Sequence, residues 1–229
     1  DLKKRIASVK STQKITKAMK MVAAAKLRKA QEAAEQSRPY SDNMKNLMDS
    51  ISRGFVPTDN SRNLLTGSDE DKTYLLVLFT SERGLCGGFN SQISKALREK
   101  VVDLQKENKI VKIICIGKKG YDIVKRQYGD QIVDTVDLSA VKSIQYEDAK
   151  KISDKIIKMY FDAEFDKCLI FYNKFKSVIS QIPTEQQVVP AEIVENDNDE
   201  NISRNNSFFE FEPNEKEILE ETLNKNNKN

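Results

Sequence analysis

The sequence predicts an α/β fold: a long N-terminal coiled-coil helix followed by a domain with a mainly parallel sheet. Residues 1–53 contain no glycine and a single proline, Pro39, which favours one long helix. From residue 73 onward, short apolar runs alternate with helix-type patterns, as in α/β domains. Between them, residues 56–72 are rich in Pro, Gly, Asn, Asp and Ser, which is typical of a linker.

The helix is expected over residues 1–55, where Ala, Lys, Met, Leu, Glu and Gln dominate. Apolar residues recur at steps of three and four from Ile15 to Ala23 and form one stripe. Bulky apolar residues are scarce in the segment MVAAAKLRKAQEAAE that follows, which favours close packing against another helix. We therefore interpret this helix as a coiled-coil shaft.

The α/β domain is expected over residues 73–194, with the buried-strand run TYLLVLFT at its start. We expect further strands at 109–117, 131–138, 166–175 and 177–190, the last two as a hairpin, and helices at 90–108, 118–129 and 145–164. Asn90 or Ser91 is the expected N-cap of the first of these helices. The alternation describes a Rossmann-like domain. Residues 195–207 are polar and read as a loop, and residues 208–229 as a foot segment whose helix starts at 214–223.

The composition excludes several kinds of chemistry. The chain has no histidine, which removes Ser-His-Asp and Cys-His nucleophiles and histidine-ligated metals. Its three cysteines, at 86, 115 and 168, match neither a disulfide framework nor a CxxC metal site. No apolar run approaches about 18 residues, so no membrane span is expected. We predict no catalytic residue, no cofactor and no metal site.

Charge is distributed unevenly along the chain. Residues 1–38 carry eleven Lys or Arg and three Asp or Glu, a local net charge of +8 in a chain whose total is +3. Nucleic-acid binding fits the sign, but no aromatic residue precedes Tyr40 and no base-reading motif is present. A membrane-surface helix would carry Trp, Phe or Leu opposite the lysines. A helix that contacts both a partner helix and an acidic protein surface accounts for the pattern better.

The segment SERGLCGGFN, residues 81–90, follows a predicted strand and precedes a predicted helix. Catalytic and phosphate-binding loops are placed in this way, so one alternative is an independent doubly wound enzyme that uses this loop. The glycine pattern matches neither of the two common phosphate-binding motifs, and no histidine is available to activate Cys86. The other interpretation is a tight strand-to-helix turn that needs glycine.

Two long motifs carry a resemblance to a known family. KRIASVKSTQKITKAMKMVAAAKLRKAQ (4–31) and LFTSERGLCGGFN (78–90) strongly resemble the γ subunit of F-type ATP synthase, and FEFEP (209–213) agrees with it. The resemblance runs through almost the whole chain. It implies a rotor stalk that couples proton flow through the c-ring to ATP synthesis or hydrolysis at the α3β3 hexamer, with no active site of its own.

The resemblance also implies partners and contact residues. The partners are the α, β and ε subunits and the c-ring, with no nucleic acid, and the protein is peripheral to the bacterial inner membrane on its cytoplasmic side or, alternatively, to the mitochondrial inner membrane on its matrix side. The residues implied at the α and β subunits are Lys14, Lys17, Met19, Lys20 and Met21, and those at the c-ring and ε are Phe209 and Phe211. Because family members continue for tens of residues past Leu223, the resemblance implies a chain shortened at its C-terminus.

Overall fold

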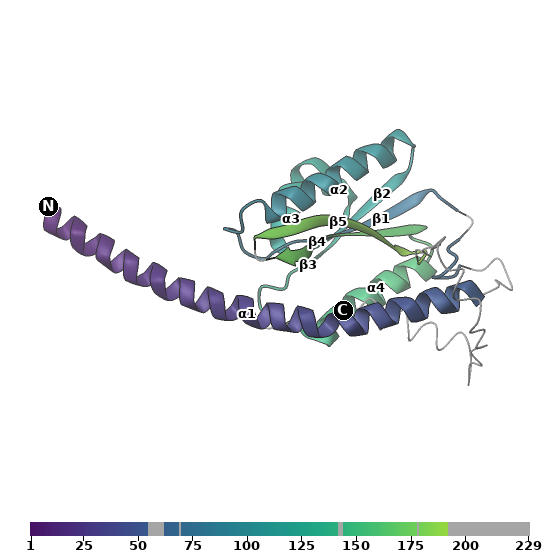
Figure 1. Cartoon of the computed structure of the whole chain (residues 1–229). Coiled ribbons are helices and arrows are strands. Elements are labelled where there is room, and N and C mark those ends of the chain that lie inside the picture. Colours follow the sequence, from purple (N-terminus) through teal and green to yellow (C-terminus); the bar gives the residue numbers. More distant parts are fainter. Residues whose placement is uncertain (55–61, 69, 142–143, 178, 192–229) are drawn as a thin grey trace. The chain divides into compact units, whose positions relative to one another are not determined.

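The computed structural model describes residues 1–54, 62–68, 70–141, 144–177 and 179–191 (Figure 1). It divides into two units, Asp1–Ser50 and the chain from Ile51 onward, which are described separately. The first is formed by the α1 helix, which runs from Leu2 to Gly54 and so ends just beyond this unit; it confirms the predicted long helix. Its surface is supported by contacts one turn apart, such as the ion pair of Arg28 with Glu32 at 2.8 Å.

The second unit is built on a five-stranded sheet with the order β3-β2-β1-β4-β5. The first four strands are parallel, and β5 pairs with β4 in the antiparallel sense, as the predicted hairpin requires. Leu76 in the central strand lies opposite Ile113 on one side and Leu169 on the other. The strands are β1 Thr73–Phe79, β2 Ile110–Ile116, β3 Ile132–Val136, β4 Lys167–Ser177 and β5 Ser180–Val189.

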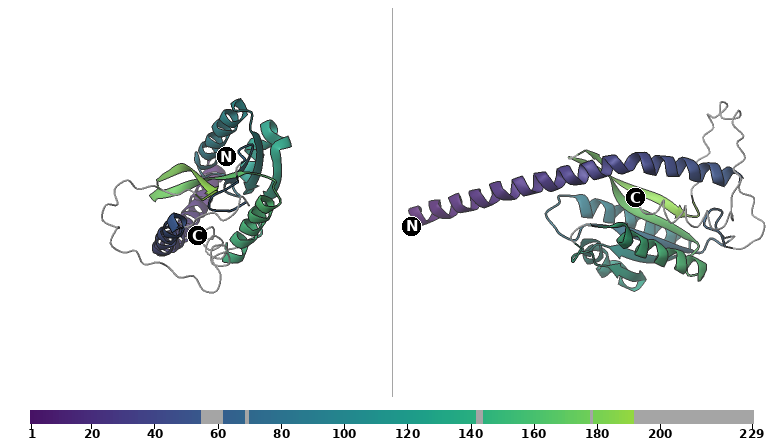
Figure 2. Two further views of the ribbon diagram at one scale, coloured as in Figure 1. Left: turned by 90° about the vertical axis from the view of Figure 1, so that its right-hand side faces the viewer. Right: turned by 90° about the horizontal axis from the view of Figure 1, so that it is seen from below.

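Three helices flank the sheet, and the direction of each crossover decides its face. The α2 helix (Phe89–Lys106) leads from β1 to β2 and the α3 helix (Lys118–Tyr128) from β2 to β3, both outward from the centre. The α4 helix (Tyr146–Phe161) leads back across the sheet to β4. Since parallel crossovers are right-handed, the reversal puts α4 on the face opposite α2 and α3 (Figures 1 and 2).

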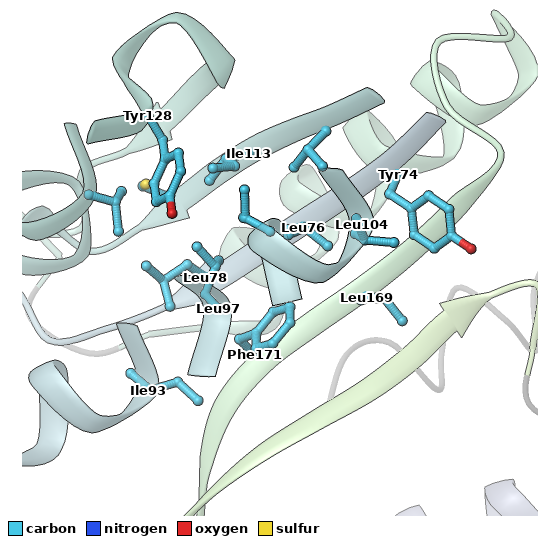
Figure 3. Packing of buried hydrophobic residues seen from close by; sticks show 14 residues of the cluster. Tyr74, Leu76, Leu78, Ile93, Leu97, Leu104, Ile113, Tyr128, Leu169 and Phe171 are labelled. Atoms are coloured by element: carbon cyan, nitrogen blue, oxygen red, sulfur yellow. The ribbon is translucent and has the colours of Figure 1, made fainter. Parts of the chain in front are cut away.

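The core lies between the sheet and the pair α2 and α3 (Figure 3). Leu76 and Leu78 of β1 point into it together with Ile93 and Leu97 of α2, and all four are fully buried. Each such side chain contributes about 1.5–3 kcal/mol by leaving water. Because side chains alternate along a strand, Leu75 and Val77 of β1 are buried on the other face.

One predicted detail is wrong. The α2 helix begins at Phe89 with Gly88 as its N-cap, two residues before Asn90 and three before Ser91, the expected caps. The amide of Asn90 is turned toward the loop before the helix, where its Oδ1 accepts the N–H of Ser81 at 3.0 Å. The residue type that usually caps a helix therefore stabilises the preceding loop instead.

Candidate functional site

The glycine-rich loop lies at the carboxyl edge of the sheet. It follows β1, whose neighbours β2 and β4 lie on opposite sides, so the strand order reverses at this point. Open α/β sheets bind their ligands in the crevice at such a switch point. The loop therefore occupies the one position in the described sheet where the alternative enzyme interpretation requires a ligand.

The loop places its own anion at the carboxyl edge, on the side of β2 and β3. The Oε2 atom of Glu82 accepts the backbone N–H of Lys118 at 3.1 Å, and its Oε1 atom accepts that of Leu138 at 2.7 Å. Lys118 is the first residue of α3, and Leu138 follows β3. A helix N-terminus of this kind attracts phosphate or carboxylate groups. Here the carboxylate of Glu82 already binds there, so the N-terminus of α3 has its anion from the chain itself.

Two further contacts occupy the first turn of α3. The N–H of Gly120 donates to the hydroxyl of Thr80 at 2.7 Å, and the N–H of Lys119 donates to the carbonyl of Ser81 at 3.2 Å. Gly117 has a φ of 96°, and a Cβ atom at this position would lie 2.2 Å from the carbonyl oxygen of Thr80. Glycine is needed there, and the first turn of α3 is filled by the chain itself.

Cys86 is exposed in this loop and has polar but non-basic partners. Its sulfur accepts a hydrogen bond from Asn90 Nδ2 at 3.1 Å and lies 3.7 Å from the hydroxyl of Ser81. The other two cysteines are buried: burial raises the pKa of Cys115 to about 12 and also raises the pKa of Cys168. Among the described contacts, no base is placed to activate a thiol, which favours the tight-turn interpretation of the loop.

The residues that the resemblance implies at the α and β subunits lie on α1. Met19 and Met21 are 63% and 66% exposed, and the three lysines are exposed as well. The spacing places Lys14, Lys17 and Met21 on one face of the helix, while Met19 lies on another. Phe209 and Phe211 lie outside the described residues.

Within the described ranges, no group of three or more Asp, Glu, Cys or His residues is arranged to hold a metal ion. None of the described helices has the length and apolar character needed to cross a bilayer.

Comparison with known proteins gives consistent results. The ATP synthase family model matches residues 1–229. The ATP synthase gamma chain of Sinorhizobium medicae is 52% identical over 227 residues, which cover 99% of this chain and 76% of that protein. The gamma chain of Pelagibacter ubique is 54% identical over 226 residues, with the same two shares.

A solved structure agrees in fold. The central stalk and c-ring structure of the Tetrahymena thermophila mitochondrial ATP synthase matches 93% of this chain and 87% of its own matched chain, with a TM-score of 0.68 and 22% identity. A long helix joined to a Rossmann-like domain thus defines a protein of the central-stalk fold class. The extensive identity to relatives goes further: the chain belongs to the ATP synthase family, among its gamma chains.

The sequence interpretation missed three residues that organise the α/β domain. Glu82 links the ends of β2 and β3 at the carboxyl edge, and Arg62 and Asp166 form a buried ion pair at the opposite edge, with 2.9 Å between Arg62 Nη2 and Asp166 Oδ1. The one available signal was an acidic residue directly before or after a strand. Asp166 fits that description, but so does the solvent-exposed Asp137, and Glu82 lies three residues past the end of β1.

Proposed function

We propose that this chain is the rotor subunit of an ATP synthase, and that it transmits rotation without catalysing a reaction itself. The observation that carries the proposal is the identity of more than half over 99% of the chain to a bacterial gamma chain. In this role, α1 is the shaft inside the α3β3 hexamer, and the α/β domain faces the ε subunit and the c-ring. Rotation couples proton flow through the c-ring to ATP synthesis or hydrolysis at the hexamer.

The division of the chain follows the same proposal. Residues 1–55 act as the shaft and 73–194 as the body of the foot, joined by 56–72. A loop at 195–207 and the segment 208–229 extend the foot toward the c-ring. Lys14, Lys17, Met19, Lys20 and Met21 contact the α and β subunits, and Phe209 and Phe211 contact ε and the c-ring. The positive charge of residues 1–38 supports contact with acidic protein surfaces.

The proposal includes a location. The complex is peripheral to the bacterial inner membrane on its cytoplasmic side, which the bacterial origin of the two relatives supports. The mitochondrial inner membrane, on its matrix side, is the alternative. The competing enzyme interpretation needs anion-binding groups at the carboxyl edge, and the carboxylate of Glu82 already occupies the helix N-terminus that follows β2.

The test is assembly and rotation. The chain is combined with α and β subunits, a bead is attached through the exposed thiol of Cys86, and the hexamer is fixed to a surface. ATP should drive rotation of the bead. The variant Lys14→Glu combined with Lys17→Glu should weaken assembly, whereas Lys95→Glu on the exposed side of α2 should leave it unchanged. A chain that neither assembles nor rotates, or a charge reversal without effect, would contradict the proposal.

A further inference from the structure

The segment 62–68, here called the anchor turn, is attached to the domain by a buried charge. The guanidinium group of Arg62 donates from Nη2 to Asp166 Oδ1 at 2.9 Å and from Nη1 to the carbonyl of Phe165 at 2.7 Å. It also lies over the ring of Tyr160, 5.4 Å from its centre. The Asp166 side chain is 4% exposed and that of Arg62 is 21% exposed. One arginine thus contacts the end of α4 and the segment that enters β4.

The same carboxylate holds the two central strands. The Oδ2 atom of Asp166 accepts the backbone N–H groups of Lys72 and Thr73, each at 2.9 Å. The N–H of Asp166 donates in turn to the carbonyl of Thr73 at 2.8 Å. Thr73 begins β1, and Asp166 directly precedes β4. Arg62 is therefore joined through one side chain to both strands at the centre of the sheet.

Further contacts fix the rest of the anchor turn. The hydroxyl of Tyr160 donates to the carbonyl of Asn63 at 3.0 Å, and the N–H of Ala191, just past β5, donates to the carbonyl of Leu64 at 2.9 Å. Leu64 and Leu65 are 6% and 2% exposed. The turn is thus bound to α4, to the start of β4 and to the end of β5.

The anchor turn makes more buried contacts than a segment that merely connects two units requires. A flexible linker requires no buried side chain, and a buried ion pair is rarely more stabilising than apolar packing of the same volume. A buried ion pair with several hydrogen bonds does, however, fix the geometry of the segments that it joins. In sequence, residues 55–61 join the anchor turn to α1. The turn is therefore the first described segment after α1 that a pull transmitted along the covalent chain reaches.

We propose that the anchor turn is a mechanical strap, in which the Arg62–Asp166 pair passes load from α1 to the central strands β1 and β4. The use of the strap in rotation rests on the proposed rotor function. The existence of the strap does not, because it concerns only how this chain responds to force.

The test is a single-molecule pulling experiment on the full chain. One handle is attached to the exposed native Cys86 and the other to a cysteine introduced by Ser11→Cys on α1, while Cys115 and Cys168 are buried. In the native chain, the anchor turn should stay attached until the domain unfolds. In Arg62→Met, residues 62–72 should come away first, in an additional step of about 35 Å at roughly 3.4 Å per residue.

Matched variants make the outcome decisive. Arg126→Met removes the same charge from the exposed side of α3 and should show no additional step. If Arg62→Met fails to fold, Arg62→Lys is the substitute. Lysine keeps the charge but cannot donate from two nitrogens to Asp166 and Phe165 at once. This variant should show the additional step at a force below that of native unfolding. An early step in the native chain, or native traces in the folded Arg62 variant, would overturn the strap.

A second measurement tests the use of the strap in rotation. In the ATP synthase complex in vesicles, Arg62→Met should lower the number of protons pumped per ATP hydrolysed, while Arg126→Met should not. A confirmed additional step together with an unchanged ratio would overturn the role in rotation. If even the native chain failed to assemble, the proposed function would be contradicted, while the pulling experiment would still decide whether the strap exists.

Discussion

Replacing Asp166 by asparagine should strongly destabilise the α/β domain. Asparagine has the same shape, but one of its two terminal atoms is an N–H₂ donor. That donor must face either the guanidinium of Arg62 or the two backbone N–H groups of Lys72 and Thr73, which are donors themselves. Asp166→Asn therefore loses the ion pair and at least one hydrogen bond in a site where the Asp166 side chain is 4% exposed.

The magnitude follows from the burial of the pair. Removing one partner of a buried ion pair costs about 3–5 kcal/mol. The side chain of Arg62 keeps a fifth of its surface in water, so we expect about 3 kcal/mol, a large part of the 5–15 kcal/mol by which domains are stable. With a urea slope of about 2 kcal/mol per molar, the midpoint should fall by roughly 1.5 M.

The assay is urea unfolding followed by the near-ultraviolet circular dichroism of tyrosine. The chain has no tryptophan and seven tyrosines, of which only Tyr40 lies in α1, so the signal reports the domain. Asp122→Asn is the control, since Asp122 pairs with Lys125 at the surface and should cost less than about 1 kcal/mol. Equal midpoints for Asp122→Asn and Asp166→Asn would refute the reasoning.

The same carboxylate should give the domain a defined acid sensitivity. Burial acts to raise the pKa of Asp166, but the N–H donors of Thr73 and Lys72 and the charge of Arg62 outweigh burial and lower this pKa below its ordinary 3.8. A lowered folded pKa adds stability that is present above pH 4 or so and is lost as the pH falls through the folded value. Asp166→Asn should lack this part of the acid dependence, and urea midpoints from pH 5 down to pH 2 would measure it.

Three further substitutions test the carboxyl edge. Cys86→Ala should leave ATP turnover of the assembled complex near normal, because the thiol has no activating base among its described partners; a loss of several orders of magnitude would favour the enzyme interpretation. Gly117→Ala should lower stability by at least about 2 kcal/mol in urea unfolding, because the added methyl group would lie 2.2 Å from a carbonyl oxygen and the φ of 96° is strained for alanine; a native midpoint would contradict this. Glu82→Gln should speed hydrogen exchange of either the Leu138 or the Lys118 amide, because one of its two terminal atoms becomes a donor, but not of the Gly120 amide, whose acceptor is unchanged; native rates at both Leu138 and Lys118 would show that the carboxylate does not hold the edge.

Local sequence patterns were sufficient to predict the helices and strands of the fold. The run TYLLVLFT predicted β1 almost to the residue, since five consecutive buried residues in a strand need an unbroken apolar sequence. The long helix was equally readable, because residues 1–53 lack glycine. The N-cap of α2 could not be read from the sequence. The Asn90 side chain could accept a hydrogen bond either from the helix or from the preceding loop, and the geometry of the loop decided for Ser81.

The contacts that organise both edges could not be read from the sequence. Arg62 and Asp166 are 104 positions apart, and their pairing depends on β4 returning to the side of β1 away from β2. The strand order is set by packing over the whole domain, whereas sequence periodicity reports only local structure. Glu82 is similar: its partners after β2 and β3 are adjacent only once three parallel strands have aligned.

The central place of β1 has a consequence for how the chain is made. Synthesis proceeds from the N-terminus, so β1, β2 and β3 leave the ribosome before β4, which starts at Lys167. During that interval, one edge of β1 has no neighbour, and an unpaired apolar edge is a template for aggregation. Translation that stops before residue 166 would leave this edge open permanently. Such fragments should need chaperones, whereas a nascent chain that has passed β4 can close its own sheet.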